Sequence, residues 1–281
     1  MRTLTGRARL AGVMGWPVAH SRSPRLHGFW LAQHDIDGAY LPLPVHPQNL
    51  AAALRALPLL GLTGVNITLP HKAAALALVD RVSEEAQRIG AINTVVVAAD
   101  GLLEGSNTDG YGFLAHLKAS APAWRASDGP AVLLGAGGAA RAIAVALLGA
   151  GVPELRLANR TARRTAELAE ALGPRVEPID WEQRSGALDG AALLVNSTTL
   201  GMAGQPPLKI SLHRLPRPAV VYDIVYVPLE TPLLAAARAR GNISVDGLGM
   251  LLHQALPGFA AWFGVTPEVT PELREFVLAA I

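Results

Sequence analysis

Residues 133–141 read LLGAGGAAR, and they lie where an apolar strand-like run at 131–134 gives way to a helical pattern at 138–148. Glycines between a strand and a helix let the backbone approach a pyrophosphate, whose phosphates then face the first N–H groups of the helix. The third glycine is shifted from its usual place, and a glycine-rich turn without a ligand is the alternative. The flanking strand and helix favour a dinucleotide site at Gly135, Ala136, Gly137, Gly138 and Ala139.

The next expected strand, at 155–158, leads into polar residues that bear on the choice of cofactor. It is followed by Asn159, Arg160 and Thr161, with Arg164 shortly after. An NAD site normally carries Asp or Glu here for the ribose 2′-hydroxyl, whereas a 2′-phosphate requires cationic donors. A solvated helix start is the alternative, but cations are disfavoured at a helix N-terminus unless an anion lies there. The segment therefore predicts NADP(H), with Thr161 as both helix N-cap and phosphate ligand.

Strand-like and helix-like patterns alternate along the whole chain, which indicates an α/β fold. In the first half, strands are expected at 10–14, 40–45 and 64–69, and helices at 24–34, 49–57 and 71–88. This order favours a mostly parallel sheet with helices on its faces. Strands expected at 91–98 and 102–104 flank the turn 99–101, which predicts a hairpin that closes one edge of the sheet.

A second α/β series follows the loop expected at 119–130 and has the strand–helix–strand spacing of a nucleotide-binding unit. Its strands are expected at 131–134, 155–158, 191–196 and 220–225, and its helices at 138–148 and 161–172. The tail is helical again at 248–263 and 271–281. Periodicity alone leaves open which half of the chain the tail packs against.

Composition excludes several classes of protein. The 281 residues carry 24 basic and 22 acidic side chains, a net charge of +2, which does not favour nucleic acid or a membrane surface as a partner. Although 51% of residues are hydrophobic, no apolar run reaches the roughly 18 residues of a membrane span. The chain has no cysteine and its first residues do not read as a secretory signal, so a cytoplasmic location is expected.

Polar residues gather in two segments of the first half, each after an expected strand. Ser21 and Ser23 precede Pro24, which stands near the start of a helix. Ser23 suits a helix N-cap, whereas Ser21 has no such duty. Two hydroxyls at the positive end of a helix would suit a small carboxylate.

The second segment, NITLPHK at 66–72, ends in one of only three lysines in a chain that otherwise uses arginine. Lys72 falls in the first turn of an expected helix, where the dipole disfavours the charged ammonium and so favours proton transfer. Asp109, in NTDG at 107–110, either caps a helix or faces Lys72 across a cleft, where it would favour the charged amine instead. The net effect on the pKa of Lys72 is open. The alternative to a functional role is that Lys72 is an exposed surface lysine.

These segments form an ordered set. In the first half they read SRSP at 21–24, NITLPHK at 66–72, GAINT at 90–94 and NTDG at 107–110. In the second half they are the glycine turn, NRT at 159–161, NST at 196–198, YDIVY at 222–226 and DGLGMLLHQ at 246–254. With this set in this order, nearly the whole chain resembles the shikimate dehydrogenase family.

The resemblance implies an oxidoreductase of aromatic amino acid biosynthesis that reversibly reduces 3-dehydroshikimate to shikimate with NADPH. It implies that Ser21 and Ser23 bind the substrate carboxylate, and that Lys72 acts with Asp109 in proton transfer to the carbonyl oxygen. The positions that match contacts to the ring hydroxyls are Thr68, Asn93, Asp109, Tyr226 and Gln254. Ile224 and Gly247 match positions lining the nicotinamide, and Glu84 matches a weaker cofactor-side position.

The resemblance also implies two domains. An N-terminal α/β substrate domain would comprise residues 1–108 completed by the helices of 248–281, and a Rossmann-like NADP-binding domain would comprise 109–247. Among the histidines, His20, His27, His71 and His253 lack the spacing of a metal site, so no metal is expected. The oligomeric state is open, with a homodimer as one alternative.

Two other functions compete with this interpretation. A quinate or shikimate-like dehydrogenase would need only small changes around Ser21, Ser23 and Thr68 to accept an added ring hydroxyl. A sensor that binds the same ligand without catalysis would have no need of both Lys72 and Asp109, and the chain shows no DNA-binding appendage.

Overall fold

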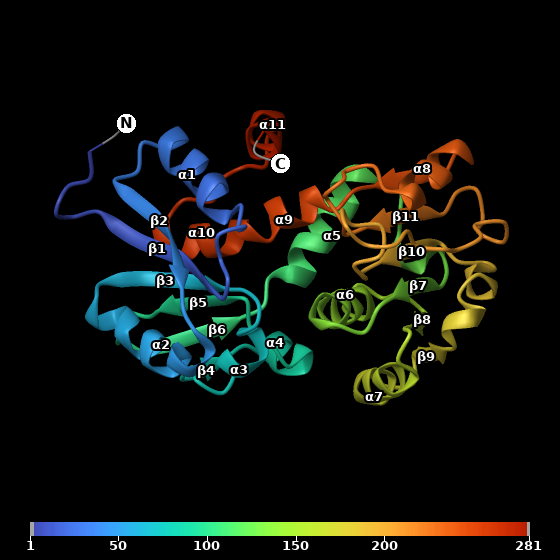
Figure 1. Cartoon of the computed structure of the whole chain (residues 1–281), viewed down its shortest axis with the longest axis horizontal. Coiled ribbons are helices and arrows are strands. Elements are labelled where there is room, and N and C mark those ends of the chain that lie inside the picture. The colour runs from blue at the N-terminus through green and yellow to red at the C-terminus, as the bar shows by residue number, and fades with distance from the viewer. Residues whose placement is uncertain (1–2, 280–281) are drawn as a thin grey trace. The chain divides into compact units, whose positions relative to one another are not determined.

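The computed structural model describes residues 3–279 and divides the chain into two compact units, each with its own sheet (Figure 1). Unit 1 comprises Met1–Thr108 and Gln254–Ile281, and unit 2 comprises Asp109–His253. The α/β class with mostly parallel sheets is confirmed. The assignment of the two predicted domains to substrate and NADP stays a prediction. Residues 280 and 281 of the helix expected at 271–281 lie outside the described residues.

Unit 1 has a six-stranded sheet in the order β2-β1-β3-β5-β6-β4. Strands β2, β1 and β3 are parallel, and β5 runs antiparallel to both of its neighbours. The strands are β1 (Arg9–Gly15), β2 (Gly38–Pro44), β3 (Leu62–Ile67), β4 (Arg81–Val82), β5 (Thr94–Val97) and β6 (Leu103–Ser106). The helices are α1 (Ser23–Gln33), α2 (Leu50–Leu59), α3 (Lys72–Ala75), α4 (Glu84–Ile89), α10 (Ala255–Phe263) and α11 (Pro271–Leu278).

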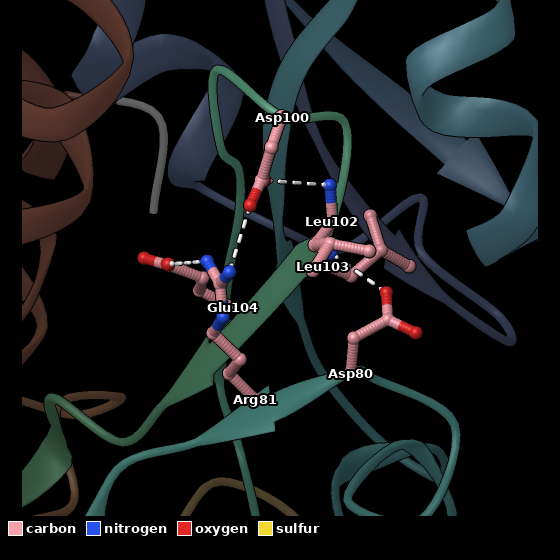
Figure 2. Close-up of polar contacts among 6 residues, drawn as sticks. All are labelled: Asp80, Arg81, Asp100, Leu102, Leu103 and Glu104. Carbon is pink, nitrogen blue, oxygen red and sulfur yellow. Dashed lines mark hydrogen bonds and ion pairs between the residues drawn. The ribbon is translucent and has the colours of Figure 1, made fainter.

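The predicted hairpin is confirmed, but it does not close the sheet. Strands β5 and β6 pair antiparallel, and β4 lies beyond β6 at the edge. The side chain of Arg81 on β4 donates to Glu104 on β6 at 2.8 Å and to Asp100 in the turn at 2.7 Å, and Asp80 accepts from the N–H of Leu103 at 2.8 Å (Figure 2). These contacts hold a strand of only two residues in place.

The single helix expected at 71–88 is wrong, because the structure breaks it into α3, β4 and α4. Ser83 starts the second helix anew: its backbone is extended and its Oγ accepts the N–H of Ala86 at 3.3 Å. A serine N-cap with Glu84 and Glu85 in the first turn is a helix start signal. The apolar periodicity on either side of Ser83 concealed that signal.

Unit 2 has a second six-stranded sheet, in the order β12-β11-β10-β7-β8-β9, with every pair parallel. The order reverses between β7 and β10, so the crevice at their carboxyl ends is the topological switch point of a Rossmann sheet. The strands are β7 (Ala131–Leu134), β8 (Leu155–Ala158), β9 (Val176–Ile179), β10 (Leu193–Asn196), β11 (Val220–Asp223) and β12 (Ile243–Val245). The helices are α5 (Asp109–Ser120), α6 (Gly138–Gly149), α7 (Ala162–Leu172), α8 (Pro232–Ala239) and α9 (Leu248–His253). Sequence analysis missed β9, β12 and α8.

The tertiary structure shows which unit each helix of the tail packs against. Helix α10 lies against β1, β3 and β5, and α11 lies against α1, all within unit 1, whereas α9 lies against α5 in unit 2. Every residue of β7 and β10 is buried, as expected for parallel strands covered on both faces. None of the helices in residues 3–279 is long and apolar enough to cross a membrane.

Candidate active site

The glycine turn of unit 2 lies at the switch point of its sheet. Gly135 follows β7 with φ of +115°, and its N–H donates to the carbonyl of Ala158 on β8 at 2.8 Å. A Cβ at Gly135 would lie 2.6 Å from the Oγ of Ser197, which itself donates to the carbonyl of Leu134 at 2.6 Å. A side chain at position 135 would therefore break the turn.

The next two glycines leave the start of helix α6 open. Gly137 is the N-cap of this 12-residue helix, no side chain caps it, and a Cβ at Gly137 or Gly138 would meet no atom within 4 Å. The start of α6 therefore has no side-chain cap and has room beside its glycines, which suits a phosphate. The residues present fit a dinucleotide at the predicted positions, Gly135, Ala136, Gly137, Gly138 and Ala139.

The residues predicted to select NADP lie after β8 at the start of α7. Arg160, Thr161 and Arg164 are exposed, and neither arginine forms a side-chain hydrogen bond or ion pair with another described residue. Thr161 is the N-cap of α7 as predicted, but its side chain makes no capping hydrogen bond. Asn159 donates from Nδ2 to the carbonyl of Thr161 at 3.2 Å and so shapes the loop. Two cationic side chains and an unused hydroxyl suit a phosphate monoester.

Ile224 and Gly247, which match nicotinamide-lining positions, lie against each other. The N–H of Gly247 donates to the carbonyl of Val225 at 3.2 Å, and a Cβ at Gly247 would overlap the backbone of Ile224. Two loops, one after β11 and one after β12, approach this closely because position 247 has no side chain.

Asp223 holds the loop after β11, which carries Ile224 and Tyr226. The carboxylate accepts from Thr231 Oγ1 at 2.7 Å, Asn196 Nδ2 at 2.9 Å and the N–H of Val225 at 3.1 Å. Burial raises the pKa of Asp223 to about 6, and these three hydrogen bonds oppose that rise. Tyr226 is half-buried in the loop.

In unit 1, two polar segments meet at one edge of the sheet. Strands β1 and β3 are parallel neighbours, so the chain leaves both at their carboxyl ends. The N–H of Thr68 donates to the carbonyl of Met14 at 2.9 Å, and the N–H of Trp16 donates to the carbonyl of Leu69 at 3.1 Å. These bonds join the two segments where they leave the strands. The predicted substrate residues Ser21 and Ser23 follow β1, and Thr68 and Lys72 follow β3.

The structure reverses the capping roles expected of the two serines. Arg22 occupies the N-cap of α1, Ser23 is the first residue of the helix, and the Oγ of Ser21 accepts the N–H of Ser23 at 3.3 Å. Ser21 therefore orders the helix start, although sequence analysis gave it no such duty. Lys72 is the first residue of α3, as expected, but α3 has only four residues. Few peptide dipoles are aligned there, so the dipole argument for Lys72 is weaker than the sequence suggested.

Asn93 and Gln254, predicted to contact the substrate, are brought together although they lie far apart in the sequence. Asn93 is buried and donates from Nδ2 to Gln254 Oε1 at 3.3 Å. Thr108 donates from its N–H to Asn93 Oδ1 at 2.9 Å and from Oγ1 to the carbonyl of Gln254 at 2.8 Å. The amide orientation of Asn93 is thereby fixed.

The remaining predicted residues occupy other places. Asp109 is the buried first residue of α5 in unit 2, whereas Lys72 lies in unit 1, so their pairing stays a prediction. Glu84 is exposed at the start of α4 in unit 1. Among residues 3–279, no group of three or more histidine, aspartate or glutamate side chains could hold a metal ion.

Sequence analysis gave no role to two buried residues of unit 1. Asn66 was quoted within its motif only, and Tyr40 was seen only as part of an expected strand. Tyr40 Oη donates to Asn66 Oδ1 at 2.6 Å in a buried contact. An asparagine inside an otherwise apolar strand is the one signal that could have indicated a buried polar contact.

Comparison with known proteins adds family evidence. Residues 13–95 match the family model described as shikimate dehydrogenase substrate binding domain, and residues 117–203 match the one described as shikimate / quinate 5-dehydrogenase. A protein named shikimate dehydrogenase (NADP(+)) from Paramagnetospirillum magneticum is 60% identical, and the match covers 98% of this chain and 100% of that protein. The equally named protein of Rhodospirillum rubrum is 61% identical, with 98% of this chain and 99% of that protein covered.

Solved structures agree with the fold. Shikimate 5-dehydrogenase from Thermus thermophilus, solved with NADP(H) and shikimate, has a TM-score of 0.85 and 40% identity over 97% of this chain and 100% of that one. Quinate dehydrogenase from Corynebacterium glutamicum, solved with NAD, has a TM-score of 0.90 and 34% identity over 97% and 99% of the two chains. The fold is thus shared by dehydrogenases named for two related substrates.

Proposed function

This chain belongs to the shikimate dehydrogenase family, and we propose that it catalyses the reversible reduction of 3-dehydroshikimate to shikimate with NADPH. The observation that carries the proposal is that β1 and β3 are parallel neighbours, so the segments that carry two serines, a threonine and a lysine leave the same end of the sheet in unit 1. Hydroxyls and an ammonium suit a small polyhydroxylated acid. The high identity to relatives named for this substrate and for NADP(+) supports the same choice.

We assign the substrate-binding roles to residues of unit 1 and to Asp109 and Tyr226 of unit 2. Ser21 and Ser23 bind the carboxylate of the substrate. The side chains that contact its ring hydroxyls are Thr68, Asn93, Asp109, Tyr226 and Gln254. The hydrogen bonds of Asn93 and Gln254 to each other and to Thr108 support this assignment, because they hold both amides in one orientation before the substrate arrives.

NADP(H) is held by unit 2 in this proposal. The turn at Gly135, Ala136, Gly137, Gly138 and Ala139 receives the pyrophosphate, and the 2′-phosphate is held by Asn159, Arg160, Thr161 and Arg164. Ile224 and Gly247 line the nicotinamide, and Glu84, which belongs to unit 1, has a weaker cofactor-side role. When bound, the cofactor supplies the hydride.

Lys72 and Asp109 supply the proton. Reduction of a ketone leaves negative charge on its oxygen, and a positioned donor at that atom accelerates such a step by about 10²–10⁴-fold. Lys72 donates to the oxygen, and Asp109 orients the amine and takes part in the proton transfer. In the reverse direction Lys72 accepts the proton of the shikimate hydroxyl.

Three further assignments complete the proposal. Residues 1–108 with 248–281 form the substrate domain, and 109–247 form the NADP-binding domain. Helix α9 (Leu248–His253) belongs to unit 2, so Gln254 is the alternative start of the C-terminal part of the substrate domain. The protein acts in the cytoplasm.

A substrate and cofactor panel tests the proposed function. Absorbance of the reduced nicotinamide is followed while shikimate or quinate is offered with NADP or NAD. We expect the highest kcat/KM with shikimate and NADP. Preference for quinate would support the alternative suggested by the Corynebacterium glutamicum neighbour. Binding of shikimate without turnover would identify a ligand sensor instead. If the protein neither binds nor turns over either acid, the proposal is refuted.

A further inference from the structure

Tyr40 is a buried residue of unit 1 that lies outside the segments assigned to the substrate. It comes from the edge strand β2, its side chain is buried, and its ring stacks on that of His27 with centroids 3.9 Å apart and an interplanar angle of 5°. The ring of Tyr40 is therefore held by strand β2, which carries it, and by helix α1, through His27. Only its hydroxyl is polar, and a buried hydroxyl is costly unless it is hydrogen-bonded.

The hydroxyl of Tyr40 is bonded to the segment that carries Thr68 and Lys72. It donates to Asn66 Oδ1 at 2.6 Å in a buried contact. Asn66 lies in β3, just before Thr68. The one donor of the hydroxyl is thus used.

Asn66 is in turn hydrogen-bonded to the neighbouring strand β5. Because its Oδ1 faces Tyr40, its Nδ2 must face β5, where it donates to the carbonyl of Asn93 at 3.1 Å and to Thr94 Oγ1 at 3.3 Å. Thr94 Oγ1 in turn donates to Asn93 Oδ1 at 2.9 Å. Asn93 finally donates to Gln254, so the chain of hydrogen bonds runs from Tyr40 to Gln254.

We propose that Tyr40 is a positioning residue for substrate binding: its hydroxyl sets the amide orientation of Asn66, and through Asn66 that of Asn93. This inference rests on the proposed function, because it takes Asn93 and Gln254 as substrate ligands. Burial raises the pKa of Tyr40 well above its usual value, so the phenol keeps its proton and remains a donor to Asn66. A phenylalanine would fill the same space without fixing the amide of Asn66.

The test compares Tyr40→Phe with the wild type in steady-state kinetics and in shikimate binding by calorimetry. Loss of the hydroxyl leaves the chemistry of Lys72 intact, so we expect KM and Kd for shikimate to rise about ten-fold, kcat to change less than about two-fold, and KM for NADP to stay unchanged. Tyr222→Phe is the matched control, since it removes another buried phenol, bonded to His116 in unit 2, and should leave the shikimate constants unchanged.

A second variant keeps the test decisive if Tyr40→Phe does not fold. Thr94→Val removes the hydroxyl between Asn66 and Asn93 and should raise KM for shikimate in the same way, again with kcat preserved. Unchanged shikimate constants in a folded Tyr40→Phe or Thr94→Val protein would overturn the inference, as would equal losses in kcat and in NADP binding. The wild type is measured first with shikimate and with quinate. If it turns over neither, the proposed function fails, and the positioning role fails with it.

Discussion

Trp262 donates its indole N–H to the backbone carbonyl of Val95 at 3.0 Å, which ties helix α10 to strand β5 of unit 1. The two residues are 167 positions apart in the sequence, and both are buried. The contact forms over Gly64 of β3: a Cβ at position 64 would overlap both the indole nitrogen and the Val95 carbonyl oxygen. The absence of a side chain at Gly64 is therefore a condition for the tail to complete unit 1.

We expect Gly64→Ala to lower the free energy of unfolding by about 1–3 kcal/mol, because the new methyl group must displace packed backbone and the indole. Urea unfolding followed by tryptophan fluorescence measures the change. Gly28→Ala is the control: Gly28 is exposed within α1 and a Cβ there meets nothing within 4 Å, so this variant should gain up to about 1 kcal/mol. Equal stability of the two variants would contradict the close approach at Gly64.

Replacement of Lys72 tests the proton-transfer role. We expect Lys72→Ala to lower kcat by about 10²-fold or more while the Kd for shikimate changes little, because the amine acts on the reacting oxygen. Turnover and calorimetric binding measure the two quantities. Lys118→Ala, at an exposed lysine in the last turn of α5, should behave as the wild type. A Lys72→Ala enzyme with normal kcat would exclude the assigned role.

Cofactor selection is tested at the start of α7. Arg160→Ala removes a forked cation and should raise KM for NADP by about ten-fold or more, with a much smaller effect on NAD, which lacks the 2′-phosphate. Arg163→Ala is the matched control, since Arg163 lies in the same exposed turn but within 3.5 Å of Glu167. Parallel losses for both cofactors would show that Arg160 does not read the 2′-phosphate.

His27 predicts a pH dependence of stability. Burial among aromatic rings lowers the pKa of His27 to about 3, whereas an unfolded chain binds the proton near the ordinary value of about 6.5. The unfolded state thus binds more protons between these values, and the stability contributed by neutral His27 is present above about pH 6.5 and is lost as the pH falls toward about 3. The slope is at most about 1.4 kcal/mol per pH unit.

His27→Phe keeps an aromatic ring without the titrating group, so the variant should lose that part of the pH dependence. Urea unfolding of both proteins at about pH 7 and about pH 5 measures the difference. His213→Gln, at an exposed histidine, should retain the wild-type dependence. If wild type and His27→Phe respond to pH identically, His27 does not contribute to the acid sensitivity.

Much of unit 2 could be predicted because its signals are local. The glycine turn, the strand before it and the helix after it lie within about twenty residues, and Arg160 and Thr161 follow the next strand. Backbone conformation at such turns depends on neighbouring residues, so Gly135 and Gly137 could be placed before any contact was known. Strands β9 and β12 were missed because both are short and partly exposed edge strands with little apolar periodicity.

The amino-acid sequence by itself determined the α/β class, the glycine turn and the serine and lysine segments after their strands, because periodicity and helix start signals act over a few residues. Only the tertiary structure decided that Ser21 orders the helix at Ser23, that the tail completes unit 1 through Trp262, and that Tyr40 is bonded to Asn66. The last two of these contacts join residues that are far apart in the chain. Such contacts depend on the register of strands and the packing of helices, which no local pattern encodes.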